Sequence, residues 1–161
     1  MKFKGKVADG KSMKRFLLTL TILGGISLFT AHSVLLALPP PSSISIELIA
    51  GEKVIDAWVV FTQKELDEGL SGVSWLRENE GMLFVLPKKV KTKFHMKGVK
   101  IPLTIAYLNG RGKILKIEDM DPKTPERVYV APDDTRFALE MNQGWFRRNG
   151  LKTGDRIRRK H

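Results

Sequence analysis

Residues 82–86, MLFVL, form an apolar run in which hydrophobic and polar positions do not alternate. A strand with one face in water shows one apolar residue in two, so this run predicts a strand that is buried on both faces. Pro87 ends the run, because proline cannot donate a hydrogen bond to a neighbouring strand. On either side of it, short β-type runs alternate with turn signals. The pattern predicts a mainly antiparallel β domain.

Runs of β-branched, aromatic or alternating apolar residues predict the other strands. They lie at residues 44–49, 54–61, 94–96, 103–108, 113–117, 127–130, 136–141 and, closing the sheet, 155–157. Asn109-Gly110-Arg111-Gly112 predicts a hairpin between two of them, because Asn-Gly tolerates the positive φ angles of a tight turn. The expected fold class is therefore a compact antiparallel β-sandwich or jelly-roll-like domain with one or two short helices.

Two short helices have local start or stop signals. In the sequence 62–65, TQKE, the Thr62 hydroxyl can accept from the amide of Glu65, while the Glu65 carboxylate accepts from the amide of Thr62. This capping box predicts a helix over residues 63–70, followed by an exposed loop at 71–80. One or two helical turns are predicted at residues 143–148, because Asn149-Gly150 provides a left-handed stop.

Residues 16–38 contain no Asp, Glu, Lys or Arg, and as a helix they would reach about 35 Å. Six Lys or Arg residues precede this run, and none lies at residues 39–52. That bias keeps the N-terminus in the cytoplasm. The expected organisation is a basic cytoplasmic flank (1–15), a transmembrane signal-anchor (16–38), a Pro/Ser spacer (39–43) and an extracytoplasmic β domain (44–161).

A cleaved signal peptide is the alternative to an anchor, because Ala31-His32-Ser33 resembles a cleavage site. The apolar run continues past this site, which favours the anchor. The sequence has no cysteine, so disulfides, thiolate metal sites and thiol nucleophiles are excluded.

The net charge of +11 has two sources. The N-terminal flank, with six basic residues and one acid, contributes five of these charges, which weakens any argument for nucleic-acid binding. The C-terminal residues 147–160 carry most of the remaining excess. They form either a solvated tail or a surface for anionic lipid.

The order of these segments resembles the domain of unknown function 192 family over residues 64–157. The matching residues are Glu68-Gly69-Leu70, GMLFV at 81–85, Phe94, Met96-Lys97, Ile101-Pro102-Leu103, Gly112-Lys113-Ile114, Ala138-Leu139-Glu140, Gly144 and Gly154-Asp155. The resemblance implies a compact β-sandwich or jelly-roll domain and no established reaction. The chain departs from the family pattern at Ser71, His95, Gly98-Val99 and Thr104.

The resemblance directs attention to His95, Met96, Lys97 and Glu140 as ligand-binding candidates. Lys97 could bind an anionic group, and Glu140 could act as a hydrogen-bond acceptor or general base. The two could instead pair with each other or with backbone amides. His95 could shuttle protons, but it has no second imidazole nearby in the sequence, and we expect no metal and no cofactor there.

Two charged clusters have a functional and a plainer interpretation. Glu118, Asp119 and Asp121 could hold calcium or form a solvated turn, since the spacing lacks the features of an EF-hand. Aromatic and basic residues interleave at 145–148, which is typical of a membrane-surface contact. One of Trp145 and Phe146 is expected to be exposed. The membrane-surface candidates are Trp145, Arg147, Arg148, Arg158 and Arg159.

No nucleophile elbow, phosphate-binding loop or dinucleotide fingerprint is present. The leading hypothesis is a membrane-anchored extracytoplasmic binding module, with membrane lipid and an unknown envelope protein, glycan or small-molecule ligand as partners, and no nucleic acid. A hydrolase or transferase that uses Glu140 and Lys97 is the alternative. A purely structural envelope protein is a third possibility.

Overall fold

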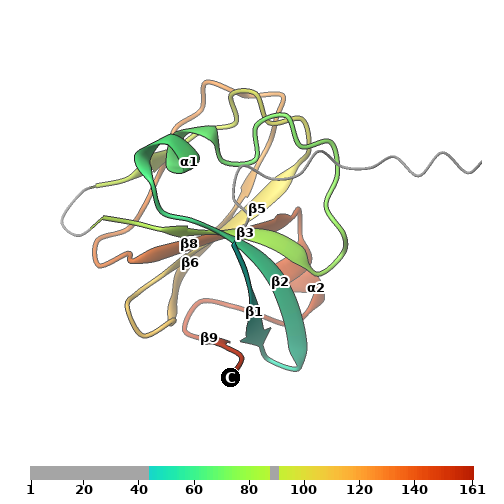
Figure 1. Ribbon diagram of the computed structural model, residues 1–161, viewed down its shortest axis with the longest axis vertical. Helices are drawn as coiled ribbons and strands as arrows, with labels where there is room; N and C mark the ends of the chain where they lie inside the picture. Colours follow the sequence, from blue (N-terminus) through green and yellow to red (C-terminus); the bar gives the residue numbers. More distant parts are fainter. Residues whose placement is uncertain (1–43, 88–90) are drawn as a thin grey trace, which may run out of the picture. The chain divides into compact units, whose positions relative to one another are not determined.

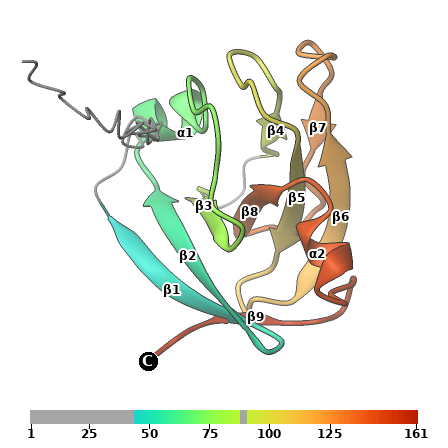
Figure 2. The same ribbon diagram turned by 90° about the vertical axis from the view of Figure 1, so that its right-hand side faces the viewer.

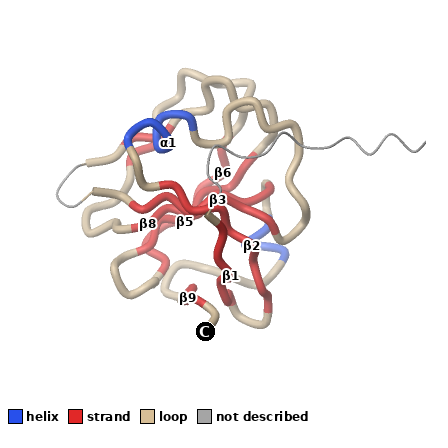
Figure 3. The backbone as a smooth tube through the Cα atoms, viewed as in Figure 1, coloured by secondary structure: helices blue, strands red, loops and turns tan. Residues whose placement is uncertain are grey.

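The computed structural model describes residues 44–87 and 91–161, and these form nine strands and two short helices (Figure 1). The elements are β1 (Ser45–Ala50), β2 (Lys53–Val60), α1 (Gln63–Glu68), β3 (Glu80–Val85), β4 (Lys93–Phe94), β5 (Leu103–Leu108), β6 (Ile114–Met120), β7 (Tyr129–Val130), β8 (Phe137–Asn142), α2 (Trp145–Arg148) and β9 (Ile157–Arg159). Strands and loops make up most of the backbone (Figure 3), which confirms the mainly β class with few short helices.

The predicted flank, signal-anchor and spacer at residues 1–43 lie outside the described residues, so their boundaries stay predictions. Within residues 44–87 and 91–161, no helix has the length and hydrophobicity needed to cross a membrane.

Seven strands form one sheet in the order β6-β5-β8-β3-β2-β1-β9, and β4 and β7 form a separate two-stranded ribbon. Every neighbouring pair in the large sheet is antiparallel except β2 and β3. Parallel strands need a crossover, and residues 61–79, which include α1, provide it. The sheet is therefore mainly antiparallel, as predicted, with one parallel pair that the sequence did not reveal.

The large sheet curls into a half-barrel, so the architecture differs from two separate sheets packed face to face. Figure 2 shows β9 running along the lower end of the sheet, beside β1. The chain just before β9 also bonds to the start of β6: the Ile114 amide donates to the Asp155 carbonyl (2.8 Å) and the Ile157 amide to the Gly112 carbonyl (2.9 Å). The last strand is shifted two residues beyond the predicted range 155–157, and the residues that lead into it join the two edges of the sheet.

The central strands are covered on both faces. Met82 and Phe84 of β3 belong to one apolar cluster, and Leu83 between them belongs to the other. Successive side chains of a strand point to opposite faces, so the two clusters lie on opposite sides of the sheet. This confirms the prediction that residues 82–86 form a strand that is buried on both faces.

Helix α1 has the capping box that the sequence predicts. The Thr62 amide donates to Glu65 Oε2 (3.0 Å), and the Glu65 amide donates to the Thr62 hydroxyl (3.4 Å). The helix ends at Gly69 with φ 45°, somewhat before the predicted end. The following loop is less exposed than predicted, because Val73 and Leu76 are buried in the same cluster as Phe84.

Helix α2 corrects one expectation about the aromatic pair. Trp145 and Phe146 are both fully buried, with ring centroids 5.3 Å apart in an edge-to-face arrangement, and the Trp145 indole donates to Asn79 Oδ1 (3.0 Å). Trp145 is therefore not available for the membrane-surface contact predicted for it. The left-handed stop is confirmed, with φ 70° at Gly150.

Candidate ligand pocket

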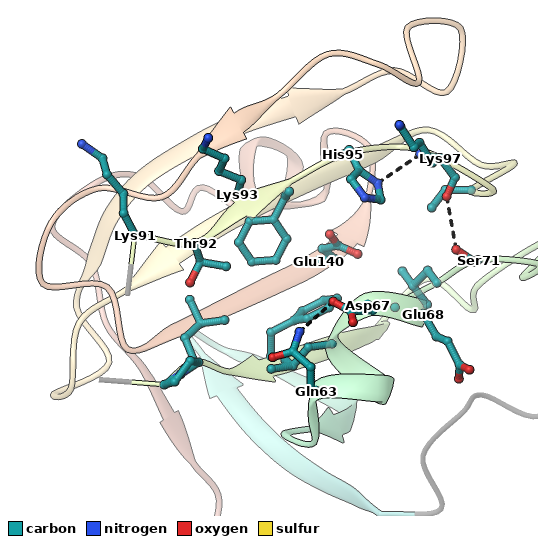
Figure 4. A pocket seen from close by; sticks show the side chains of 18 residues that line it. Gln63, Asp67, Glu68, Ser71, Lys91, Thr92, Lys93, His95, Lys97 and Glu140 are labelled. Atoms are coloured by element: carbon teal, nitrogen blue, oxygen red, sulfur yellow. Dashed lines mark hydrogen bonds between the residues drawn. The ribbon is translucent and has the colours of Figure 1, made fainter. Parts of the chain in front are cut away.

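A pocket of about 290 Å³ lies between α1 and the segment 91–99 (Figure 4). Side chains of α1 form one wall and those of the segment form the other, with Glu140 of β8 between them. The lining residues are Gln63, Leu66, Asp67, Glu68, Gly69, Leu70, Ser71, Phe84, Leu86, Pro87, Lys91, Thr92, Lys93, Phe94, His95, Lys97, Val99 and Glu140.

Glu140 is placed by the most enclosed part of the sheet. It pairs with Met82 of β3 on one side and with Ile105 of β5 on the other. Its residue surface is only 4% exposed, and its carboxylate points into the pocket (Figure 4). No side chain or backbone group in the described part of the chain forms a hydrogen bond or ion pair with this carboxylate. The residue is enclosed, but its carboxylate oxygens are not among the fully buried atoms that lack a partner, so they face the open pocket, where water or a ligand can bond to them.

The surroundings of Glu140 favour its neutral form. Burial raises the pKa of the Glu140 carboxyl from 4.5 to about 8, because the charged form loses its hydration. The carboxyl is therefore mostly protonated at neutral pH and can donate as well as accept a hydrogen bond. Burial also raises the pKa of the Tyr107 hydroxyl, with smaller contributions from Glu118 and Glu140.

Aromatic rings form the apolar part of the pocket. Phe84 and Phe94 line it and contact each other edge to face, with centroids 5.3 Å apart and an interplanar angle of 88°. Phe94 in turn packs against Tyr107, with centroids 5.8 Å apart. Leu66, Leu70, Leu86 and Val99 complete these walls. The deep part of the pocket is thus an apolar environment around one acid.

The rim carries charges of both signs. Lys91, Lys93, His95 and Lys97 are exposed on one wall, while Asp67 and Glu68 are exposed on α1. Several of these are already partnered: Lys97 Nζ lies 2.9 Å from Glu126, Gln63 donates to Asp67 (2.8 Å), and Lys64 lies 3.8 Å from Glu68. Exposed pairs of this kind contribute little to stability.

Three of the four ligand-binding candidates line this pocket, namely His95, Lys97 and Glu140. Met96 does not, because it is fully buried in the core between two exposed neighbours. The His95 ring accepts a hydrogen bond at Nδ1 from the Lys97 amide (3.3 Å). The Lys97 amino group points away from Glu140 (Figure 4), and no hydrogen bond or ion pair joins the two described side chains.

The sequence did not reveal the α1 wall of the pocket. Gln63, Leu66 and Asp67 come from a helix whose sequence signal concerned only its start. Ser71 fixes the loop after α1 to the opposite wall, because its hydroxyl donates to the Lys97 carbonyl (3.2 Å). The family match at Glu68-Gly69-Leu70 was the one sequence signal that pointed to the α1 wall. It did not indicate which strand this wall would face.

Other candidate residues lie outside the pocket. Thr104, which replaces a residue usual in the family, is buried, accepts from the Gly144 amide (2.7 Å) and donates to Asp119. Glu118 accepts from the Tyr107 hydroxyl (3.0 Å) and pairs with Lys116 (2.7 Å). Within residues 44–87 and 91–161, no group of three or more His, Asp or Glu side chains could hold a metal ion.

The four arginines among the membrane-surface candidates are exposed, unlike Trp145. Arg147 and Arg148 lie on α2, and Arg148 forms an ion pair with Glu78 (3.2 Å). Arg158 and Arg159 lie on β9, which pairs with β1 at the edge of the sheet.

Fold and pocket together define a small, curled-sheet β domain with an acid at the base of an apolar pocket. Residues 46–159 match the domain of unknown function 192 family, described as an uncharacterized ACR, and the chain belongs to this family. The resemblance noted from the sequence is thus confirmed. No curated protein matches the chain.

Two solved structures share the fold. One, from Sinorhizobium meliloti and described as a "putative transcription regulator", is 23% identical, with a TM-score of 0.65, and the match covers 71% of this chain and 92% of that one. The other, a protein of unknown function from Novosphingobium aromaticivorans, is 24% identical, also with a TM-score of 0.65, and the match covers 76% and 91% of the two chains. At this level of identity the likeness concerns the fold alone.

Proposed function

We propose that this protein is a membrane-anchored, extracytoplasmic binding module that holds a small molecule in the pocket around Glu140. The observation that carries the proposal is the buried, unpartnered carboxyl that points into the pocket. Burying a polar group without a hydrogen-bond partner costs free energy, and a bound ligand would supply the missing partner. Small-molecule sites typically have apolar walls around polar groups that fix the ligand, and Phe84, Phe94 and Leu66 form such walls near Glu140.

The anchoring part of the proposal rests on the sequence of residues 1–43 and on the basic residues near the C-terminus. A charge-free run with a basic flank is typical of a single transmembrane segment with its N-terminus in the cytoplasm. Arg158 and Arg159 of β9 lie beside β1, the first strand after the spacer. These arginines lie opposite Ile49 and Leu48, in the half of β1 that is farther from residue 44, and their charges favour contact with anionic lipid headgroups.

A ligand screen tests the binding part. The full chain, kept in a non-ionic detergent, is screened against a fragment library by ligand-observed NMR, with protein-free detergent as the blank. Fragments that bind the native chain should lose binding in Glu140→Gln and keep it in Glu52→Gln, which changes an exposed acid outside the pocket. The proposal fails if no fragment binds or if every binder is indifferent to Glu140→Gln.

Protease accessibility tests the orientation. Protease added to intact cells should digest the domain that follows residue 43, because the positive flank keeps only the N-terminus inside. A cytoplasmic marker protein should stay intact in the same sample. Digestion that occurs only after lysis would contradict the extracytoplasmic location.

A hydrolase or transferase is the second candidate, and the raised pKa of Glu140 favours it, since a carboxyl that keeps its proton at neutral pH can act as a general acid. Lys97 would have to leave Glu126 to take part. Turnover of any substrate by the native chain, lost in Glu140→Gln, would replace the binding role with this one.

A further inference from the structure

We propose that the pocket selects small organic amines, with the ammonium group paired to Glu140 and the carbon skeleton packed against Phe84 and Phe94. The inference rests on the binding function proposed above and adds the chemical class of the ligand. It follows from three features of the pocket: the kind of polar group at its base, the rings around that group, and the size of the space.

The base of the pocket offers one polar side chain. Among the described residues, the buried polar or charged side chains are Thr104 and Glu140, and only Glu140 lines the pocket. An ionised carboxylate only accepts hydrogen bonds, whereas an ammonium group only donates them, so the two are complementary. A ligand carboxylate could only accept one hydrogen bond from the protonated acid and would repel its ionised form.

Among residues 44–87 and 91–161, no basic side chain forms an ion pair with Glu140. Lys91, Lys93 and Lys97 lie at the exposed rim, and burial is the cause of the raised Glu140 pKa. Without a partner the buried acid keeps its proton, and it can ionise when a ligand brings the opposite charge into the pocket. A cationic ligand provides this partner, whereas a neutral alcohol provides only a hydrogen bond.

The rings favour the same ligand. Phe84 and Phe94 line the pocket beside Glu140, and their edge-to-face contact turns the two rings at nearly a right angle. The faces of aromatic rings attract cations, and the attraction grows where water is excluded. A carboxylate with aromatic walls therefore suits an ammonium group on an apolar skeleton.

The volume limits the ligand to a small one. A space of about 290 Å³ is at the lower end of the range for small-molecule pockets, which is about 300–1,000 Å³. A single aromatic ring with a short aminoalkyl chain is of suitable size. The rim carries charges of both signs, so it favours neither cations nor anions. The preference for an amine must therefore come from Glu140 at the base of the pocket.

Calorimetry with three matched probes tests the proposal. The full chain in non-ionic detergent is titrated at neutral pH with 2-phenylethylamine, with 2-phenylethanol as its neutral counterpart, and with 3-phenylpropanoate as the anion. The amine should bind roughly tenfold or more tightly than either of the others. Glu140→Gln should remove this preference, while Glu52→Gln should keep it.

Proton release provides a second readout. Pairing with an ammonium group makes Glu140 give up its proton, so amine binding should release close to one proton at neutral pH. The measured heat should then differ between phosphate and Tris buffers, which have different ionisation enthalpies. The affinity for the amine should rise as the pH increases towards the pKa of Glu140.

Three results would overturn the amine proposal: equal binding of the amine and the alcohol, no binding of the amine, or unchanged amine binding in Glu140→Gln. Glu140→Asp, which keeps the charge on a shorter side chain, should retain part of the preference and guards against a folding defect in Glu140→Gln. If the alcohol or the anion binds in a Glu140-dependent way, the binding function stands and only the ligand class is wrong.

Discussion

Two buried polar residues of the described chain differ in how they are satisfied. Thr104 accepts from the Gly144 amide and donates to Asp119, so its burial leaves its hydroxyl with partners on both sides. Glu140 is equally buried, and no described group bonds to its carboxylate. Local rules of folding are broken most often at functional sites, which is why Glu140 rather than Thr104 marks the pocket.

The stability of the native fold should fall as the pH rises, because of Glu140. Its pKa is about 8 in the folded chain and close to 4.5 when it is exposed. Between these values the folded state holds a proton that the unfolded state has lost, so stability is greatest below pH 4.5 for this group and decreases up to about pH 8. The contribution amounts to roughly 1.4 kcal/mol for each pH unit. Urea unfolding at a series of pH values measures it.

Glu140→Gln is the matched comparison for this pH dependence. The variant has no titrating group at this position, so the difference in unfolding free energy between it and the native chain should change with pH in the same window. Glu52→Gln should follow the native curve, since that carboxylate is exposed. Parallel curves for the native chain and Glu140→Gln would show that Glu140 ionises normally in the fold.

At the scale of the elements, α1 holds one wall of the pocket with a helix of only two turns. Isolated helices of this length are unstable, so its capping and packing must hold it. Hydrogen bonds from the amides of Thr62 and Phe61 lower the pKa of the Glu65 carboxyl, which shows that the cap prefers the ionised acid. The stabilisation from this carboxylate is therefore present above its unfolded pKa and is lost as the pH falls.

Removal of the cap should destabilise the domain modestly. Thr62→Ala leaves the Glu65 amide without its acceptor, and losses at such positions are typically about 1 kcal/mol. Denaturant unfolding measures the change. Ser74→Ala, an exposed serine in the loop after α1, serves as the control and should have almost no effect. Equal effects of the two substitutions would contradict a role for the capping box.

Most elements could be predicted from the sequence because their signals are local. The capping box, the run at residues 82–86 and the stop at Gly150 each depend on neighbouring residues. The parallel pairing of β2 with β3 could not be predicted, since it depends on where the crossover at residues 61–79 returns to the sheet. The prediction of an exposed loop at residues 71–80 was wrong for a similar reason, because Val73 and Leu76 are buried by distant parts of the chain.

The candidate site was predictable only in part. The resemblance directed attention to His95, Lys97 and Glu140, which line one pocket. No sequence pattern indicated that Glu140 would lack a partner or that Lys97 would pair with Glu126, because both depend on the relative positions of separate strands and loops. The aromatic walls were likewise hidden, because Phe84 and Phe94 belong to the family match but nothing in the sequence placed them in a pocket.

At the scale of the whole domain, the junction between the start of β6 and the start of β9 holds the curled sheet in shape. β9 pairs with β1 at one edge of the sheet, and Gly112 and Ile114 before and within β6 lie at the other edge. Gly112 has φ 73°, and a Cβ atom added there would overlap the Ile157 carbonyl oxygen. The close approach of the two edges therefore requires glycine at this position.

Gly112→Ala should destabilise the domain much more than Gly150→Ala. Both glycines have a positive φ, at 73° and 70°, so both substitutions carry the cost of a left-handed alanine, about 1–2 kcal/mol. Only Gly112→Ala adds the overlap with the Ile157 carbonyl, since no atom lies within 4 Å of the Cβ position at Gly150. We expect a further loss of about 2 kcal/mol in urea unfolding.

Hydrogen exchange separates this effect from general destabilisation. In Gly112→Ala the amides of Ile114 and Ile157, which bond across the junction, should exchange faster relative to those of β3 and β8, whereas Gly150→Ala should leave that ratio unchanged. Because the junction lies at the sheet edges and the pocket at the central strands, Gly112→Ala should keep Glu140-dependent binding while it remains folded. Equal unfolding losses for the two alanine variants would mean that the junction does not hold the sheet curled.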